Sequence, residues 1–280
     1  MSEFLGLMAA PFCACLVLVG IHTYLGLHVL EREVIFVDLA LAQVAALGAV
    51  IGTLFGLEMR GGGAYVFSLI ATLMGAVLFT LTRPRGGPAK SRVPHEAVIG
   101  IVYAVTASGV ILVLARAPRG AEHVQELLVG SILWVTWSEV GKIALLYALI
   151  GAFHWIFRRK FLLVSRDPGS AHREGISVAW WDFLFYASFG FVVTSSVGLA
   201  GVLLVFSILI IPAVAAALVA VSVTCRVLLG WGFGAAGSIV GIVISYGLDL
   251  PVGAAVVCTL GLVLAIWGVA LKVGANKAGW

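Results

Sequence analysis

Charge is the scarcest property of this sequence. Only 11% of its 280 residues are Asp, Glu, Lys or Arg, whereas 62% are hydrophobic and the mean hydropathy is +1.14. Soluble globular domains have about 25% charged residues, so a soluble fold of this length is excluded. We therefore expect a membrane protein that forms one domain over residues 1–280, with no segment left over for a soluble domain.

Motifs for energy coupling and hydrolysis are also missing. The sequence has no P-loop with Gly-Lys-Ser/Thr, no HExxH and no nucleophile elbow, so we expect no enzyme activity of its own. No surface that combines aromatic and basic residues is visible, which argues against a nucleic-acid partner. The four cysteines lack a CxxC spacing and lie in or beside apolar runs, as small buried hydrophobic residues do: Cys13, Cys15, Cys225 and Cys258.

Long apolar runs follow one another from end to end. They lack the period-two alternation of barrel strands, so they predict transmembrane helices of about 20 residues each. The 34 glycines are scattered through these runs, as expected where helices pack by close backbone approach. We expect an all-α, polytopic bundle with about nine spans, at 5–28, 34–56, 64–82, 96–115, 139–157, 179–195, 199–221, 229–247 and 252–271.

Basic residues predict the orientation, because cytoplasmic loops retain Lys and Arg. Two loops hold most of them, and both should face the cytoplasm, with the N-terminus outside and the C-terminus inside. The turns expected at 194–198 and 247–251 then lie outside. A short surface helix is expected over 122–137, anchored by Trp134 and Trp137. The residues that decide the orientation are Arg83, Arg85, Lys90 and Arg92 in one loop, and Arg158, Arg159, Lys160, Arg166 and Arg173 in the other.

Asp38 is a carboxylate inside the apolar run 34–56. Near the bilayer centre such a group costs at least ~2.5–3.5 kcal/mol, and it normally faces a wet cavity and marks a pathway for the transported species. Alternatively, the helix begins near residue 33 or 34, and Asp38 lies about one turn in, where the positive end of the helix dipole tolerates it. Both interpretations stay open from the sequence.

Two further polar side chains are candidates for the same path. Gln43 follows Asp38 by five residues, about 140° further round the helix, so the pair does not share one face. Gln43 can equally tie helices together. His22 and His154 could each add an imidazole, although a lone histidine in a helix is more often a hydrogen-bonded packing residue.

The longest polar segment, 158–178, contains a predicted short helix. Asp167 is suited to cap it, Pro168 to open it, and Gly175 to end it. The pattern indicates a short amphipathic helix that lies across the cytoplasmic face. The alternative is a solvated connector between two spans.

Pro212 stands in the middle of the apolar run 199–221. A proline there removes one backbone hydrogen bond and kinks the helix, which is tolerated where neighbours or water satisfy the freed carbonyl. Kinked helices of this kind often line cavities, and a plain packing kink is equally common.

Six stretches together resemble the membrane permease of zinc, manganese and iron ABC importers, the ABC-3 family. The resemblance covers nearly the whole chain, and the last three stretches make it specific. They are REVIFVDLALAQVAALGAVIG from Arg32, EAVIGIVYAV from Glu96, LLVGSILWVTWSEV from Leu127, SRDPGSAHREGISVAWWD from Ser165, VGLAGVLLVFSILIIPAVAAALVA from Val197, and SYGLDLPVGAAVV from Ser245.

The resemblance implies a homodimeric permease in a bacterial or archaeal inner membrane, with a fold similar to type II ABC importer permeases. Cytoplasmic ATPase subunits would power it, and an extracytoplasmic metal-binding protein would deliver the cargo, a divalent cation such as zinc, manganese or iron. No permanently bound cofactor is implied. The segment 161–177 matches the coupling segment that docks on the ATPase, which gives Asp167, Pro168, Ala171, Glu174 and Gly175 a coupling role.

The sequence departs from the family in the second helix. Members commonly carry a GDALSHA-like stretch whose Asp and His bind the metal, and alignment of ALSH with ALAQ puts Leu39 and Gln43 at these positions, with Asp38 displaced by one. An amide is a poor zinc ligand, whereas oxygen-rich sites suit manganese better. Two other classes compete with the importer: a transporter or channel driven by an ion gradient, and a membrane scaffold that moves nothing.

Overall fold

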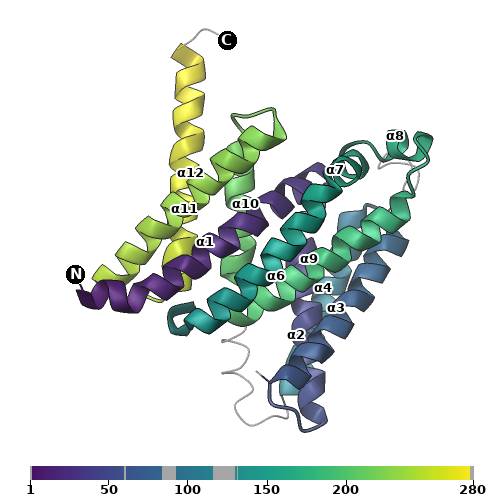
Figure 1. The fold of residues 1–280 in the computed structure, drawn as a ribbon, viewed down its shortest axis with the longest axis horizontal. Coiled ribbons are helices and arrows are strands. Elements are labelled where there is room, and N and C mark those ends of the chain that lie inside the picture. Colours follow the sequence, from purple (N-terminus) through teal and green to yellow (C-terminus); the bar gives the residue numbers. More distant parts are fainter. Residues whose placement is uncertain (1, 60, 84–92, 116–129, 131, 278–280) are drawn as a thin grey trace. The chain divides into compact units, whose positions relative to one another are not determined.

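The computed structural model describes residues 2–59, 61–83, 93–115, 130 and 132–277. Every regular element in these ranges is a helix (Figure 1), as the all-α prediction requires. A helix bonds its backbone groups internally, and a chain in lipid needs this because no water can satisfy them. The helices are α1 Ser2–Glu31, α2 Val37–Leu54, α3 Gly62–Thr82, α4 His95–Leu114, the 3₁₀ turn η2 Ile132–Trp134, α6 Trp137–Ile156, α7 Arg158–Arg166, α8 Pro168–Arg173, α9 Val178–Ala200, α10 Val202–Ala217, α11 Val223–Leu248 and α12 Val252–Lys277.

Eight helices in the described part of the chain are long and apolar enough to cross a membrane: α1, α2, α3, α4, α6, α9, α11 and α12. They correspond to eight of the nine expected spans. The ninth, 199–221, is occupied by α10, whose 16 residues extend ~24 Å. This is less than the ~30 Å of a hydrocarbon core, so the number of spans is nine only if α10 is counted.

Two expected turns have different outcomes. The turn at 247–251 is confirmed, because α11 ends at Leu248 and Asp249 follows with a left-handed φ of 52°. The prediction of a turn at 194–198 is wrong, because α9 continues to Ala200. The hydroxyls of Ser195 and Ser196 bond to carbonyls of the preceding helical turn, at 2.9 and 2.6 Å, so they do not compete with the helix. The chain turns instead at Gly201, whose φ is 78°.

The surface helix expected over 122–137 lies largely outside the described residues. In the described part, η2 is a single 3₁₀ turn and Trp137 is the first residue of α6. Trp134 is 75% exposed and Trp137 60% exposed, as interfacial anchors would be.

The chain divides into two compact units, which are described one at a time. The prediction of one domain over 1–280 stays a prediction beside this division. The first unit comprises Met1–Leu30, Val129–Ala144 and Leu199–Trp280, and the second comprises Glu31–Leu128 and Leu145–Gly198.

In the first unit, glycines bring α11 close to its neighbours. A Cβ on Gly230 would lie 3.2 Å from the Pro212 carbonyl oxygen of α10, and one on Gly241 would lie 2.6 Å from the Val256 backbone of α12. Trp231 donates its indole N–H to the Gly20 carbonyl of α1 at 2.9 Å. Pro212 is therefore buried at the contact between α10 and α11, and its kink stays a prediction.

In the second unit, α2 packs against both α3 and α4. A Cβ on Gly48 would lie 2.6 Å from the Phe67 carbonyl oxygen of α3, so the two backbones almost touch. Thr72 of α3 and Thr194 of α9 share a hydrogen bond of 3.0 Å between their hydroxyls. Close backbone approach and interhelical hydroxyl bonds are the packing devices expected where lipid supplies no hydrophobic force between helices.

Replacing Gly48 with alanine should destabilise the protein, because the added methyl overlaps α3 backbone and Ala71. Overpacking of a tight contact costs ~1–3 kcal/mol, which should appear as a lower melting temperature of the detergent-purified protein. Gly100→Ala on α4 is the matched control, since no atom lies within 4 Å of its added Cβ. Equal melting temperatures for the two variants would contradict the described contact between α2 and α3.

Candidate functional site

Asp38 lies in the first turn of α2, one residue after the helix begins at Val37. No side chain of α2 caps this helix start, but Glu96 of α4 accepts the backbone N–H of Phe36 at 2.9 Å. The location agrees with the alternative in which Asp38 stands near the positive end of the helix dipole, and not near the middle of the span.

The Asp38 carboxylate is nevertheless unusual for a helix start. The residue is 0% exposed, and neither of its oxygens has a hydrogen-bond partner among the described residues. Buried carboxylates are normally hydrogen-bonded or paired, so this one keeps its full capacity to accept a cation or donors from another molecule.

The other path candidates do not join Asp38 in a closed site. Gln43 is buried on the same helix, whereas His22 belongs to the first unit, where its Nδ1 lies 2.8 Å from the Leu18 carbonyl oxygen. No group of three or more His, Cys, Asp or Glu side chains that could hold a metal occurs among the residues that the structure describes. Within its described residues, the second unit thus offers Asp38 and Gln43 on different sides of α2 and no cluster of three metal-binding side chains.

His154 has a packing environment. Its Nε2 lies 2.8 Å from the Ser188 hydroxyl oxygen, and its ring stacks on Phe161 with 4.1 Å between ring centroids. This agrees with the interpretation of His154 as a hydrogen-bonded packing residue.

The segment 158–178 contains the predicted short helix, α8, preceded by the nine-residue helix α7. Asp167 caps α8 by accepting the backbone N–H of Ser170 at 2.9 Å, and its carboxylate also accepts the Ser170 hydroxyl. These bonds, the hydroxyl bond first, hold the pKa of the Asp167 carboxyl below its usual value. Pro168 occupies the first helical position, as its fixed φ favours.

The end of α8 is also built as expected. Gly175 follows the helix with a φ of 74°, and its N–H donates to the His172 carbonyl at 3.0 Å, while Ile176 donates to Ala171 at 2.9 Å. Ala171 is fully buried, and Glu174 forms an exposed ion pair with Arg159 at 3.3 Å. The local structure of a compact, capped helix is therefore confirmed, whereas its coupling role is not tested by this geometry.

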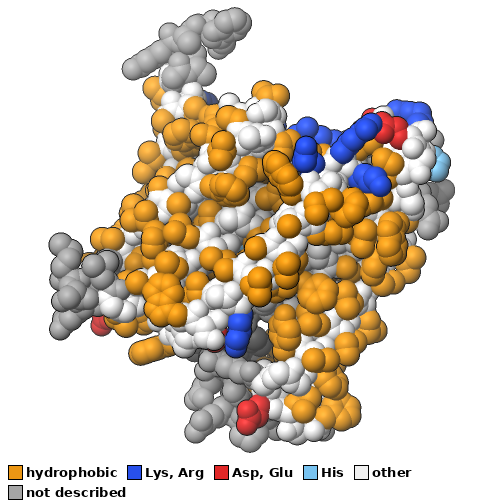
Figure 2. Space-filling model, in the orientation of Figure 1, with side chains coloured by type: hydrophobic (Ala, Val, Ile, Leu, Met, Phe, Trp, Pro, Cys, Tyr) orange, Lys and Arg blue, Asp and Glu red, His pale blue; other side chains and the backbone are white. Residues whose placement is uncertain are grey.

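Helix α7 is amphipathic and brings positive charge to the same end of the second unit. Phe161 and Val164 are fully buried on one face, whereas Arg159 is exposed on the other. Figure 2 shows Lys and Arg side chains gathered over α7 and α8, while hydrophobic side chains cover most of the rest of the visible face. A basic end beside an apolar body is the arrangement expected at a cytoplasmic membrane boundary.

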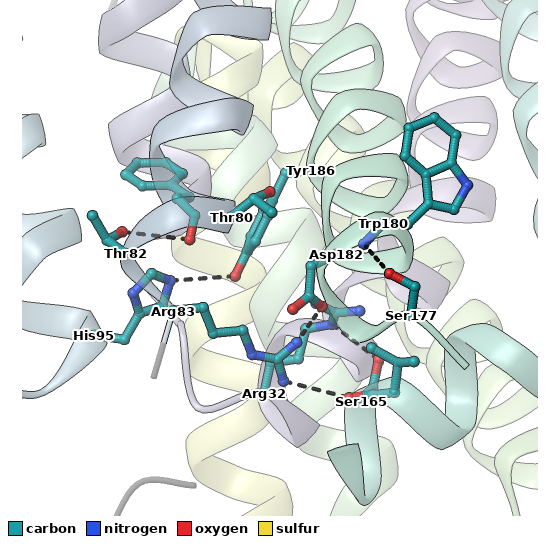
Figure 3. A network of polar contacts seen from close by, with 12 residues as sticks. Arg32, Thr80, Thr82, Arg83, His95, Ser165, Ser177, Trp180, Asp182 and Tyr186 are labelled. Carbon is teal, nitrogen blue, oxygen red and sulfur yellow. Dashed lines mark hydrogen bonds and ion pairs between the residues drawn. The ribbon is translucent and has the colours of Figure 1, made fainter. Parts of the chain in front are cut away.

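A buried charge cluster beside α7 was not predicted from the sequence. Asp182 of α9 accepts hydrogen bonds from Arg32 at 2.6 Å and from Arg83 (Figure 3). The side chains of Arg32 and Asp182 are 0% and 2% exposed. The only signal in the sequence is that each of these charges stands at the edge of an apolar run, which does not indicate that they meet.

Burial also affects the Arg32 guanidinium. Removal from water lowers its pKa, and the negative charge of Asp182 opposes this change. Arg32 additionally lies over the Phe185 ring, 4.0 Å from its centroid, so the cation is covered by an aromatic face as well as paired.

Comparison with known proteins shows the family to which this chain belongs. A family model described as the ABC 3 transport family matches residues 5–270. The chain belongs to the ABC 3 transport family. The match runs through both units and includes Asp38, α7 and α8, so the resemblance stated from the sequence motifs is confirmed.

Two relatives with functional names and one solved structure are similar to this ABC 3 family chain. The manganese transport system membrane protein MntC of Listeria innocua is 31% identical over 179 residues, which is 63% of each chain. A protein of Haemophilus influenzae named "Probable iron transport system membrane protein" is 27% identical over 60% of this chain and 61% of its own length. The matches thus span less than two thirds of these relatives. PsaBC of Streptococcus pneumoniae, solved in complex with a Fab, is 22% identical with a TM-score of 0.76 over 95% of this chain and 94% of that one, which shows the shared fold.

The depressed pKa of Asp167 predicts how the cap of α8 responds to acid. Because the folded pKa lies below the ordinary value of ~3.9, the cap stabilises α8 at pH values above ~3.9, and this contribution is lost as the pH falls through the lowered folded pKa. A ¹³C NMR titration of the Asp167 carboxyl in lipid nanodiscs should give a midpoint below 3.9. In Ser170→Ala, which removes the hydroxyl donor, the midpoint should rise. The same midpoint in both proteins would refute the role of Ser170.

Proposed function

We propose that this chain is the membrane permease subunit of an ABC importer for a divalent transition-metal cation. The main support is the match to the ABC 3 transport family over residues 5–270. The names of the relatives favour manganese or iron as cargo. In this proposal the chain is not itself an enzyme: separate ATPase subunits hydrolyse ATP, and an extracytoplasmic metal-binding protein delivers the cation.

We assign Asp38 and Gln43 of the second unit to the path of the metal, and His22 of the first unit is a separate candidate for it. Asp38 contributes a buried carboxylate without a hydrogen-bond partner in the described chain, and this negative charge lowers the barrier for a dication. Gln43 offers an amide oxygen. Oxygen ligands suit manganese better than zinc, whose protein sites favour Cys, His and carboxylate.

Weak coordination is what a conduit needs. A cation must be bound strongly enough to enter and weakly enough to leave, and a closed cage would trap it. The described residues contain no cluster of three metal-binding side chains, which suits transient binding. Two copies of the chain around a common axis would supply two such paths or one shared path, so a homodimer belongs to the proposal.

The ATPase subunits dock on the segment 158–178. Helix α8 is short, capped at both ends, and presents exposed side chains beside the buried Ala171. Such a compact helix can move as a rigid body when a partner pushes on it. Asp167, Pro168, Glu174 and Gly175 keep its two ends fixed.

Removing the Asp38 carboxylate should stop transport. In proteoliposomes that contain the permease, its ATPase and its metal-binding protein, Asp38→Ala and Asp38→Asn should each lower ATP-dependent manganese uptake at least tenfold. This corresponds to a loss of ~1.4 kcal/mol or more. Assembly should persist, because the lost carboxylate has no hydrogen-bond partner in the described chain.

Asp249→Asn, an acid-to-amide change at the exposed turn after α11, is the matched control and should transport normally. Uptake at the control level in Asp38→Asn would remove Asp38 from the path. Uptake of the cation without ATP or ATPase subunits would favour a gradient-driven transporter or channel. Parallel uptake assays with zinc and iron(II) identify the preferred cargo.

A change at Gly175 should weaken coupling. Gly175→Val places a β-branched residue at a φ of 74°, which should unwind the end of α8 and lower both ATPase binding and transport several-fold. Gly175→Asn is the control, since asparagine tolerates left-handed backbone. Copurification of the ATPase subunits measures the effect. Equal recovery of ATPase with both variants would contradict docking at this segment.

A further inference from the structure

The buried charge cluster joins three parts of the second unit through one carboxylate. Asp182 lies in the second turn of α9, Arg32 in the turn before α2, and Arg83 directly after α3. The ion pairs bridge 150 and 99 residues of sequence. Both guanidinium groups converge on the same Asp182 oxygen (Figure 3), so this one side chain is bonded to both segments at once.

The same two arginines also hold α7. Arg32 donates from Nε to the Ser165 hydroxyl at 2.9 Å, and Arg83 donates to the Val164 carbonyl at 3.4 Å. One arginine thus bonds α7 and α9 at once with different nitrogens of its planar fork, a geometry that lysine cannot reproduce. Since α7 leads directly into α8, the cluster lies between the proposed docking segment and the other helices of this unit.

A further contact connects α7 to Glu31, the last residue of α1, which directly precedes Arg32. Arg166, the last residue of α7, forms an ion pair with Glu31 at 3.0 Å. Two consecutive residues, 31 and 32, are therefore bonded to α7. The turn that follows is tight, with Glu33 at a left-handed φ of 55°, and α2 begins at Val37 with Asp38 next. Only a few residues separate Arg32 from Asp38, so a movement of α7 that displaces Arg32 is expected to displace Asp38 as well.

A buried ion pair contributes little net stability to the contact between these helices. Desolvating two charges offsets much of their attraction, and apolar residues of similar volume often stabilise as well or better. Directional bonds between charges hold their partners at fixed positions, whereas apolar contacts allow neighbouring side chains to slide. Arg32, whose side chain is 0% exposed, cannot move away from Asp182 without leaving a buried cation that lacks its carboxylate, so the joined segments are expected to move together.

We propose that Asp182 is a positioning residue which, through Arg32 and Arg83, transmits movement of α7 and α8 to the beginning of α2. This inference rests on the proposed function and extends it, because it names the connection between the ATPase-driven segment and the cation path. ATP hydrolysis then moves α7, the cluster moves with it, and the first turn of α2 that carries Asp38 is displaced.

The test measures how many cations are imported for each ATP hydrolysed. The complete complex of permease, ATPase subunits and metal-binding protein is reconstituted in proteoliposomes, and manganese uptake and phosphate release are recorded on the same sample. Asp182→Asn preserves the shape of the side chain and removes its charge. It should lower the ratio of manganese to ATP at least threefold while ATP hydrolysis continues. Asp182→Glu, which keeps the charge, should retain more of the ratio.

A role in stability alone would lower the melting temperature and the amount of complex without changing this ratio, because the ratio does not depend on how much complex is present. A ratio in Asp182→Asn above one third of the wild-type value overturns the proposal. If Asp182→Asn does not assemble, Arg32→Lys decides by the same limit, since lysine keeps the positive charge but cannot bond Asp182 and Ser165 at once. Asp249→Asn is again the control for an acid-to-amide change. Absence of ATP-dependent uptake by the wild-type complex would instead overturn the proposed function.

Discussion

The constraint behind the whole structure is that a backbone crossing hydrocarbon must satisfy its own hydrogen bonds. Helices do this. Polar side chains in the spans also find partners within the helix, since the hydroxyls of Ser195 and Ser196 bond to carbonyls of α9 itself. Several breaks between helices in the described ranges have a residue with a positive φ, such as Gly201 and Gly175. Because helices are the only regular elements found in the described ranges, function must come from how they pack and from the few polar groups that they bury.

Packing within each unit follows from the same constraint. Lipid is as apolar as the side chains, so helices gain little from a hydrophobic force and associate through close contact instead. Gly48 lets α2 approach the backbone of α3, and Gly230 lets α11 approach α10 at Pro212. The hydroxyl pair of Thr72 and Thr194 adds a directional bond between α3 and α9. Such contacts fix the distance between helices more strictly than lipid-facing side chains could.

Buried charge is concentrated where it can connect helices or face a cation. In the second unit, one oxygen of Asp182 is paired with two arginines, whereas Asp38 keeps both oxygens without a partner among the described residues. The two carboxylates are equally inaccessible to water and have opposite environments. One is suited to hold segments in register, and the other is free of such a bond in the described chain and can accept a positive charge.

The sequence by itself determined the class of the protein, most of the helices and the local design of α8. Its composition excludes a soluble fold, and the cap at Asp167 and the stop at Gly175 depend on hydrogen bonds between residues at most five apart. Only the tertiary structure decided that Arg32 and Arg83 meet at Asp182 and that Asp38 is buried without a partner in the described chain. The physical reason is distance along the chain: a local bond follows from neighbouring residue types, whereas a bond across 99 or 150 residues depends on which helices pack together.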